Sequence, residues 1–162
     1  MSEQEAPADA RRREHVRMSP AQVGAYLDGP HTMIVATNGV GGFPHQVAVF
    51  YIMDGDNPRF WSYRKAQKIV NIGRDPRVSC LVETGVDYRE LRGVLLTGRA
   101  HVSAEPAVVE HTWRRLTEKY SGPITPADVA NFQRQADKRC VVTVEVAGLV
   151  SWDHSKLPTA RH

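Results

Sequence analysis

Six apolar segments with the composition of β-strands, and the order in which they follow one another, constrain the fold more than any other feature of the sequence. They are rich in Val, Ile and aromatic residues, and turns rich in Gly, Pro, Asn and Asp separate several of them. The predicted helices are inserted between strands and do not alternate with them, which argues against a parallel doubly wound sheet. We therefore predict a mainly β (α+β) fold, a six-stranded antiparallel barrel with peripheral helices, with strands at residues 33–37, 45–53, 60–63, 78–83, 92–102 and 140–152.

Four helices are predicted around these strands from their start and stop signals. Ser19 and Thr125 each precede a proline and can cap a helix with their hydroxyl groups. Pro76 ends another helix, because the residue before a proline is pushed out of helical geometry. A stripe of apolar residues at i, i+4, i+7 and i+11 predicts the longest helix. The predicted helices run from Pro20 to about Leu27, up to Asp75, from Glu105 to Tyr120 and from Pro126 to Ala136.

The composition is that of one globular domain. Of 162 residues, 41% are hydrophobic and 24% are charged, which is enough apolar material for a real core. Residues 1–17 are polar and without periodicity, so we expect an N-terminal tail, a single domain over residues 18–152 and a C-terminal tail over residues 153–162. The net charge of +3 suits a phosphorylated or carboxylated small ligand at least as well as nucleic acid.

Two cysteines, Cys80 and Cys140, lie in apolar strand-like segments, which indicates core residues of a reduced protein more than a disulfide. No apolar run reaches the roughly 20 residues that a membrane helix needs. No apolar segment follows the N-terminal charges either, so we expect no signal peptide and a cytoplasmic protein.

Several motifs with known chemistry are missing. The seven histidines form no zinc-type arrangement with cysteines or acids, and there is no Gly-x-Ser-x-Gly elbow or phosphate-binding P-loop. The glycine-rich residues 38–42 lead into a strand and not into a helix, which favours a hairpin loop over a dinucleotide-binding loop. We therefore predict no metal site, no hydrolase chemistry and no nucleoside triphosphatase chemistry.

The candidate ligand site lies at the start of the short helix within residues 60–78. Lys65 and Lys68 are three residues apart and are therefore neighbours on one side of this helix. Free backbone N–H groups, the helix dipole and two ammonium groups together favour a bound phosphate. Lysines at a helix start are also common on a solvated surface, and Asp-Pro-Arg is also a common stop signal. The spacing of the whole stretch favours the phosphate.

This spacing resembles the pattern of the flavin-binding split barrels, the family that includes pyridoxamine 5′-phosphate oxidase and the deazaflavin-dependent reductases of actinobacteria. The pattern combines an aromatic residue, a hydroxyl residue, a lysine, an Asn-Leu/Ile pair and an Asp/Asn-Pro-Arg-Val/Ala run. It is matched by Phe60, Ser62, Lys68, Asn71-Ile72 and Asp75-Pro76-Arg77-Val78. Ala66 departs from it, because relatives often place a hydroxyl residue or an arginine there, and Arg64 or Lys65 would supply the missing contact.

The resemblance implies a split β-barrel over residues 19–152 and a homodimer with two cofactor sites at the subunit interface. Lys68, helped by Lys65 or Arg64, would hold the phosphate of the cofactor. Ser62 would donate to the phosphate or to the ribityl chain, and Trp61 would pack near the ring edge. No catalytic acid or base is assigned, since hydride chemistry belongs to the cofactor. The cofactor-binding residues implied in this way are Val47, Ala48, Trp61, Ser62, Arg64, Lys65 and Lys68.

The same resemblance favours coenzyme F-420, a deazaflavin, as the cofactor. Residues 71–77 and 88–94 look more like the actinobacterial deazaflavin branch than the pyridoxamine phosphate oxidases, and the chain ends without the Arg-x-His motif of the oxidases. The expected function is an oxidoreductase that uses reduced F-420 as hydride donor to a small organic acceptor. The alternatives are an FMN-dependent, pyridoxamine 5′-phosphate oxidase-like enzyme and a non-catalytic flavin or tetrapyrrole carrier.

Overall fold

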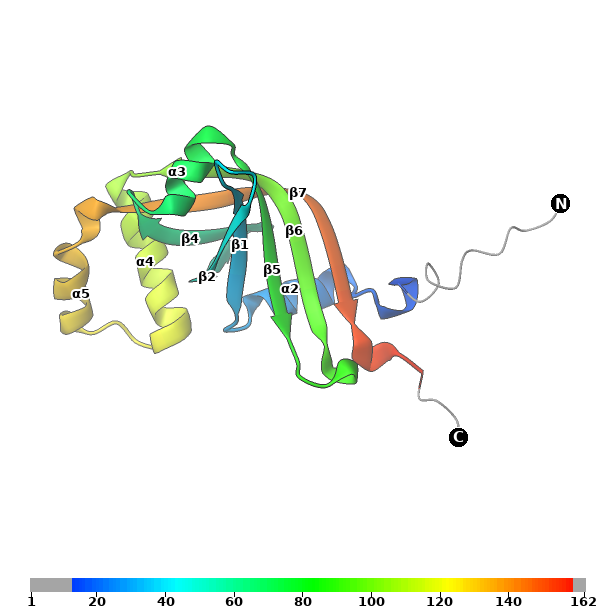
Figure 1. The fold of residues 1–162 in the computed structure, drawn as a ribbon. Coiled ribbons are helices and arrows are strands. Elements are labelled where there is room, and N and C mark those ends of the chain that lie inside the picture. Colours follow the sequence, from blue (N-terminus) through cyan, green and yellow to red (C-terminus); the bar gives the residue numbers. More distant parts are fainter. Residues whose placement is uncertain (1–12, 159–162) are drawn as a thin grey trace.

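The computed structural model describes residues 13–158, which form one antiparallel sheet with helices around it (Figure 1). The strand order is β2-β1-β5-β6-β7-β4-β3. The strands are β1 (Thr32–Asn38), β2 (Pro44–Phe50), β3 (Ile52–Asp54), β4 (Asn57–Tyr63), β5 (Arg77–Thr84), β6 (Arg92–Ser103) and β7 (Arg139–Asp153). Residues 13–16 are helical, and the helices that follow are α2 (Pro20–Asp28), α3 (Gln67–Arg74), α4 (Pro106–Ser121) and α5 (Pro126–Gln133), with 3-10 turns η1 (Tyr88–Glu90), η2 (Ala136–Lys138) and η3 (His154–Lys156).

The predicted single strand over residues 45–53 is wrong, because the chain leaves the sheet at Tyr51. Tyr51 is fully buried, its hydroxyl donates to the Leu27 carbonyl oxygen at 2.7 Å, and its N–H donates to the Tyr120 hydroxyl at 3.3 Å. Two strands result, β2 and β3, and they lie at opposite edges of the sheet. The sheet therefore has seven strands and not six, while the predicted antiparallel fold with peripheral helices is confirmed.

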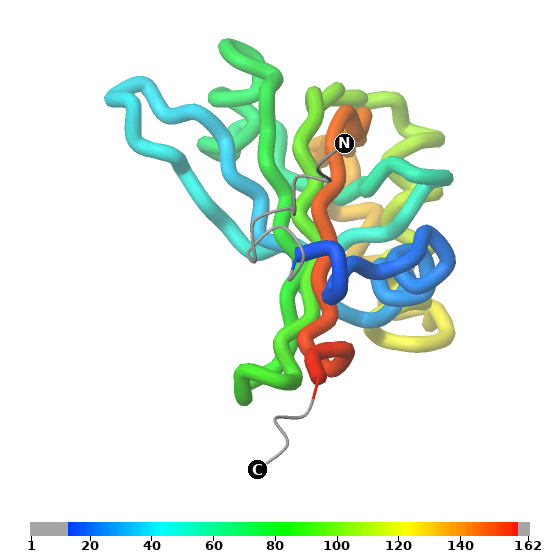
Figure 2. Tube along the Cα trace, turned by 90° about the vertical axis from the view of Figure 1, so that its right-hand side faces the viewer, coloured from blue at the N-terminus to red at the C-terminus, as the bar shows by residue number. Residues whose placement is uncertain are grey.

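The link through Tyr51 also determines the shape of the sheet. Because a single residue joins the two edge strands, the sheet curls until these edges approach each other, and the result is a half-barrel. Figure 2 shows the loop end of the β1–β2 hairpin projecting from the sheet, while β1 stays paired with β5 over Ile34 to Thr37.

The main core lies on the inner face of the half-barrel, which α2 covers. Alternate residues of the strands point to this face and meet Val23, Tyr26 and Leu27 of α2. Ser19 caps α2 as predicted: its hydroxyl accepts from the Gln22 N–H, and the Gln22 side chain accepts from the Ser19 N–H. Each large apolar side chain buried here stabilises the fold by about 1.5–3 kcal/mol.

A second, smaller core lies on the opposite face of β4 and β7, under α4 and α5. Val109 and Trp113 of the predicted apolar stripe pack there against Phe132 of α5, and the rings of Trp113 and Phe132 stack at 4.4 Å. Thr125 caps α5 as predicted, although the helix ends at Gln133 and not at Ala136. These two helices therefore brace the outer side of β7 and of β4, the strand that leads to α3.

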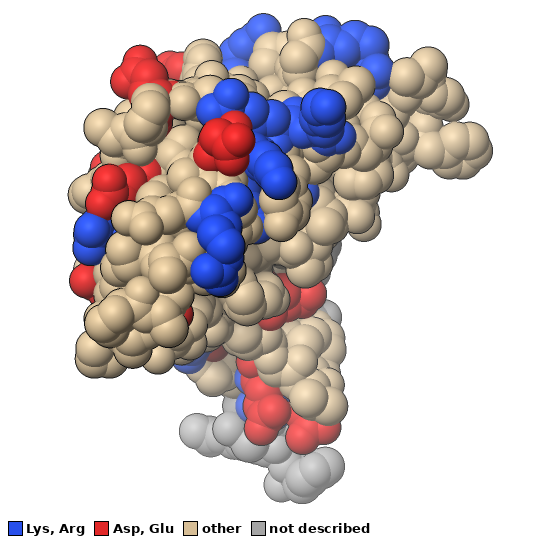
Figure 3. Space-filling model, turned by 90° about the vertical axis from the view of Figure 1, so that its left-hand side faces the viewer, with Lys and Arg blue, Asp and Glu red and all other residues tan. Residues whose placement is uncertain are grey.

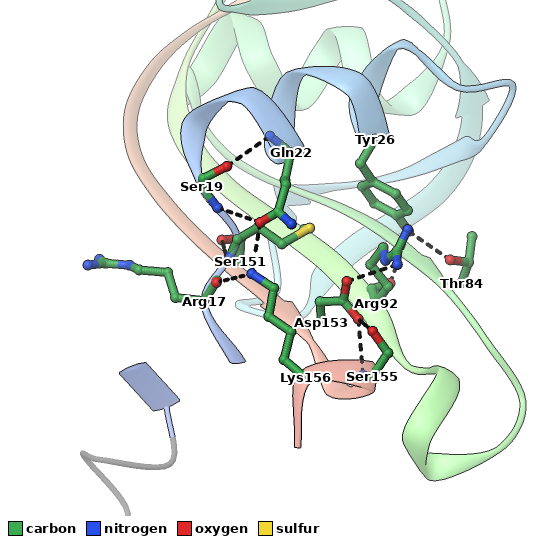
Figure 4. Close-up of polar contacts among 11 residues, drawn as sticks. Arg17, Ser19, Gln22, Tyr26, Thr84, Arg92, Ser151, Asp153, Ser155 and Lys156 are labelled. Atoms are coloured by element: carbon green, nitrogen blue, oxygen red, sulfur yellow. Dashed lines mark hydrogen bonds and ion pairs between the residues drawn. The ribbon is translucent and has the colours of Figure 1, made fainter. Parts of the chain in front are cut away.

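The two ends of the described chain are tied together beside β7 (Figure 4). Lys156 donates to the Arg17 carbonyl oxygen at 2.6 Å and to Gln22 Oε1 at 2.8 Å. Asp153 forms an ion pair with Arg92 at 2.8 Å, and its other carboxylate oxygen accepts from Ser155. These bonds hold the segment before α2 against the end of the sheet.

Part of the predicted tails lies outside the described residues, namely residues 1–12 and 159–162. Within the described part, Val16 is only 7% exposed and Asp153 is the last residue of β7. The packed domain thus begins before residue 18 and continues past residue 152. No helix within residues 13–158 is both long enough and apolar enough to cross a bilayer.

Candidate functional site

The turn from β4 into α3, at one end of the half-barrel, forms the start of the candidate site. The Arg64 N–H donates to the Lys138 carbonyl oxygen at 3.0 Å, which attaches the end of β4 to η2. Ala66 occupies the N-cap position of α3 and offers no side-chain acceptor to the first turn. At the starts of α2 and α5 a hydroxyl takes this role, but at α3 no side chain caps the N–H groups of Gln67 and Lys68, and an anion could accept from them.

Four basic residues surround this turn, and we name them the cationic cradle: Arg64, Lys65, Lys68 and Arg139. Lys68 is half-buried, and burial lowers the pKa of its ammonium group. Within the described chain, none of the four forms an ion pair with a carboxylate. Figure 3 shows Lys and Arg side chains gathered on this side of the molecule. Partly buried cations without acidic partners favour a bound anion.

Arg139 joins the cradle from β7, and this residue was not predicted from the sequence. Its guanidinium carbon lies 3.4 Å from the Tyr63 ring centre and 4.1 Å from the Trp61 ring centre. Its Nε donates to Gln135 Oε1 at 3.0 Å, and its Nη2 donates to the same oxygen. Burial lowers its pKa. No local sequence signal could have identified Arg139, because the contact depends on the pairing of β4 with β7.

Trp61 and Ser62 were both expected to contact the cofactor, and they point to opposite faces of β4. Trp61 packs in the second core, with its ring 6.4 Å from that of Phe132, and reaches the cradle through Arg139. Ser62 is only 3% exposed, and its hydroxyl donates to the Tyr63 carbonyl oxygen at 3.3 Å. The Ser62 hydroxyl would have to rotate away from that carbonyl to serve a ligand.

Val47 and Ala48, the remaining predicted contacts, lie on β2, apart from the other five residues in the strand order. Val47 is half-buried, and Ala48 is exposed on the opposite face of the strand. His45 lies on the same strand, and its enclosed Nδ1 has no hydrogen-bond partner among the described residues. The structure therefore brings Arg64, Lys65 and Lys68 together at the start of α3, with Trp61 and Ser62 on opposite faces of β4, and it places Val47 and Ala48 on a separate strand.

Other residues of the motif hold the cradle in place. The Asn71 side chain is fully buried, donates to Thr37 Oγ1 at 3.0 Å and thereby attaches α3 to β1. Asp75 accepts from the Arg77 guanidinium at 2.7 Å and from the Asn38 amide at 2.9 Å, and these bonds hold the pKa of its carboxyl well below the usual value. Asn71 and the Asp-Pro-Arg run thus orient α3.

The donor set at α3 consists of backbone N–H groups, ammonium groups and guanidinium groups. These donors suit a phosphate or a carboxylate, and charge-assisted bonds to such groups are among the strongest in proteins. In the described part of the chain, no group of three or more His, Cys, Asp or Glu residues is placed to hold a metal ion. The residues present therefore fit the phosphate end of the expected cofactor.

Comparison with known proteins gives an independent result. Residues 19–153 match the family described as "Pyridoxamine 5'-phosphate oxidase". No match was found among curated proteins.

Solved structures show the same architecture. A conserved hypothetical protein from Mycobacterium tuberculosis has a TM-score of 0.83 and 34% identity, over 93% of this chain and 95% of its own. An F420 reductase has a TM-score of 0.61 and 25% identity, over 77% of this chain and 93% of its own. A FAD-binding protein from Mesorhizobium loti has a TM-score of 0.63 over 83% and 94% of the two chains, but at 16% identity it supports the fold alone.

Proposed function

Because the chain belongs to the pyridoxamine 5′-phosphate oxidase family of flavin-binding split barrels, we propose that it is an oxidoreductase that uses reduced coenzyme F-420 as hydride donor to a small organic acceptor. The observation that carries this proposal is the cationic cradle at the uncapped start of α3. Its position coincides with the lysine of the family pattern. The similarity to an F420 reductase at 25% identity supports the choice of the deazaflavin.

In this proposal the protein binds and orients the cofactor, and the cofactor, when bound, supplies the hydride. Lys68 would form a charge-assisted bond with the phosphate, and the first N–H groups of α3 would add to it. Arg139 is held rigid by Tyr63 and Trp61, so it would contribute its positive charge without losing further side-chain freedom. Lys65 is exposed and would act mainly through long-range attraction.

FMN is the second candidate cofactor, in a pyridoxamine 5′-phosphate oxidase-like enzyme or in a non-catalytic carrier. The same donor set favours FMN as well, because the cradle would bind the anionic group of the cofactor. It would not contact the ring atoms that distinguish a flavin from a deazaflavin. The protein would then carry FMN at α3, with the same contacts to Lys68.

We also propose that the chain forms a homodimer through the outer face of the sheet. Directly paired residues on five neighbouring strands form one apolar row there: Ala48, Ile34, Leu81, Leu95 and Val150. Val150 is 58% exposed in the single chain. Contiguous apolar surface of this kind is typical of protein interfaces.

A cytoplasmic location is part of the proposal, and two free, buried cysteines support it. Burial raises the pKa of the Cys80 thiol to about 12, and the pKa of the Cys140 thiol is raised by the same cause. Buried, protonated thiols of this kind suit a reducing compartment.

The test is a titration of the purified protein with F-420 and with FMN, followed by oxidation of reduced F-420 in the presence of acceptors such as quinones or biliverdin. We expect tighter binding of F-420 than of FMN, and turnover with at least one acceptor. A protein that is yellow as purified, with an FMN spectrum and no affinity for F-420, would overturn the deazaflavin. Binding of F-420 without turnover on any acceptor would favour the carrier.

A further inference from the structure

A pocket lies between α2 and the inner face of the half-barrel, and it shares no residue with the cationic cradle. Its volume is about 470 Å³, which is within the range of small-molecule sites. Its apolar lining consists of Leu96 of β6, Val146 and Leu149 of β7, Val23 and Leu27 of α2, and Met53 of β3. Leu149 is 43% exposed, although it points to the face that carries the core. The complete lining is Arg17, Met18, Pro20, Val23, Gly24, Leu27, Asp28, Met53, Gly55, Asp56, Leu96, Val146, Leu149 and Ser151.

Gly24 is the feature of this pocket that needs an explanation. It lies in the interior of α2, where glycine is one of the least favourable residues. Its backbone is not in the left-handed region, and a Cβ atom added to it would meet no heavy atom within 4 Å. Neither packing nor backbone conformation therefore requires glycine at this position. Gly24 is exposed and lines the pocket, so a larger side chain at this position can extend over the pocket, and glycine leaves that space open.

The charges at the edge of the pocket are unequal. Asp28 and Asp56 both line it, and within the described chain neither forms an ion pair, although the ammonium group of Lys119 lies near enough to Asp28 for the two charges to attract each other. Asp28 is also the last residue of α2, where the negative end of the helix dipole adds to its charge. Arg17 is the only basic residue of the lining, and it precedes the opposite end of α2. The end of the pocket near Asp28 therefore favours a cation.

We propose that this pocket binds a small molecule with an apolar body and a cationic amine group. The apolar body lies over Leu96, Val146 and Leu149, in the space that Gly24 leaves open. The amine lies near Asp28 and Asp56. The side chains of Met18 and Met53 adjust to the shape of the ligand, since methionine has a flexible and polarisable side chain. This site is independent of the cofactor proposal, because it requires nothing bound at α3.

Calorimetric titration of the full chain with octylamine, octanol and octanoate tests the site, because these probes share the apolar chain and differ in charge. We expect octylamine to bind most tightly. Gly24→Leu fills the pocket and should weaken binding of octylamine by about tenfold or more. Ala21→Leu is the matched control, because Ala21 lies on the same helix, is exposed and does not line the pocket, and its effect should be negligible.

A double variant, Asp28→Asn with Asp56→Asn, separates the charge from the cavity. This double variant should bind octylamine more weakly than the unmodified protein and should bind octanol with unchanged affinity. Unchanged octylamine affinity in Gly24→Leu overturns the proposal, provided that circular dichroism shows a folded chain. Tighter binding of octanoate than of octylamine also overturns it. Failure of the full chain to bind any probe, or binding only after removal of residues 1–12, overturns it as well.

Discussion

The guanidinium carbon of Arg139 lies 3.4 Å from the centre of the Tyr63 ring, and Trp61 packs on it at 4.1 Å. This stack holds a partly buried cation beside Lys68 without a carboxylate partner among the described residues. The arrangement fixes the position of a positive charge before any ligand arrives. Pre-organised charges of this kind bind anions with a smaller entropic cost than flexible ones.

The first prediction follows from this stack. Arg139→Gln should weaken binding of F-420 by about 1–2 kcal/mol, because the cofactor loses either a charge-assisted hydrogen bond to the guanidinium or the long-range attraction of its positive charge. Isothermal titration gives the affinity directly. Arg134→Gln is the matched control, since Arg134 is an exposed arginine outside the cradle whose side chain donates to Asn131 of α5. Equal affinities for Arg139→Gln and the unmodified protein would remove Arg139 from the cradle.

Lys68 should contribute more than any other member of the cradle. Lys68→Ala is expected to weaken cofactor binding by roughly 1.5–3 kcal/mol through loss of a charge-assisted hydrogen bond. Lys65→Ala, three residues earlier and fully on the surface, should have a smaller effect because solvent and salt screen its charge. Fluorescence titration with F-420 and with FMN measures both variants. If the two lysine variants bind equally, Lys68 has no special role.

The pH dependence of anion binding tests the protonation state of Lys68. Burial lowers the pKa of Lys68 in the free protein below 10.5, and a bound phosphate favours the ammonium form. The affinity for phosphate is therefore highest below the lowered pKa of Lys68 and falls as the pH rises through that pKa. This decline begins at a lower pH than it would for an exposed lysine. Titration with inorganic phosphate at a series of alkaline pH values should show this decline. In Lys68→Arg the decline should disappear, because arginine stays charged; the same decline in both proteins would contradict the assignment.

Local signals predicted most of the helices, and distant contacts explain the error in the sheet. Ser19, Thr125 and Pro76 act on residues within one helical turn, so their effects follow from the sequence alone. The break at Tyr51 does not, because its hydroxyl and its N–H bond to Leu27 and Tyr120, which lie far away in the chain. An apolar alternation that continues from β2 into β3 cannot show that the chain changes from one sheet edge to the other.

The residues of the candidate site likewise fall into those that local sequence signals identify and those that depend on distant contacts. Lys68 and Lys65 were found because their spacing on one helix is a local property. Arg139 was missed because it reaches the cradle only through the pairing of β7 with β4. For Ser62 the sequence predicts more than the structure supports. Its position in the motif predicts a ligand contact, but only the structure shows that the side chain is buried and that its hydroxyl donates to the Tyr63 carbonyl oxygen.

Asn71 should be important for stability and not for ligand contact. Its side chain is fully buried and bonds to Thr37 at 3.0 Å and to Gln67 at 2.9 Å. Asn71→Ala leaves the buried Thr37 hydroxyl without this donor, and we expect a loss of about 1–3 kcal/mol in the free energy of unfolding. Urea denaturation measures the loss. Asn131→Ala, at an exposed position of α5, is the control and should change stability little. A stable Asn71→Ala protein with lost cofactor affinity would reverse this assignment.

The apolar row on the outer face gives the last prediction. Leu81 lies at its centre, paired with Ile34 on one side and Leu95 on the other. Leu81→Asp places a charge in the proposed interface, where burying it without a partner is costly. Light scattering should show the unmodified protein at twice the chain mass of 18.1 kDa and the variant at that mass. Val86→Asp is the matched control, because Val86 is 94% exposed, lies outside the row and should leave the dimer intact. A monomeric unmodified protein, or a Leu81→Asp protein that remains dimeric, would show that this face is not the interface between subunits.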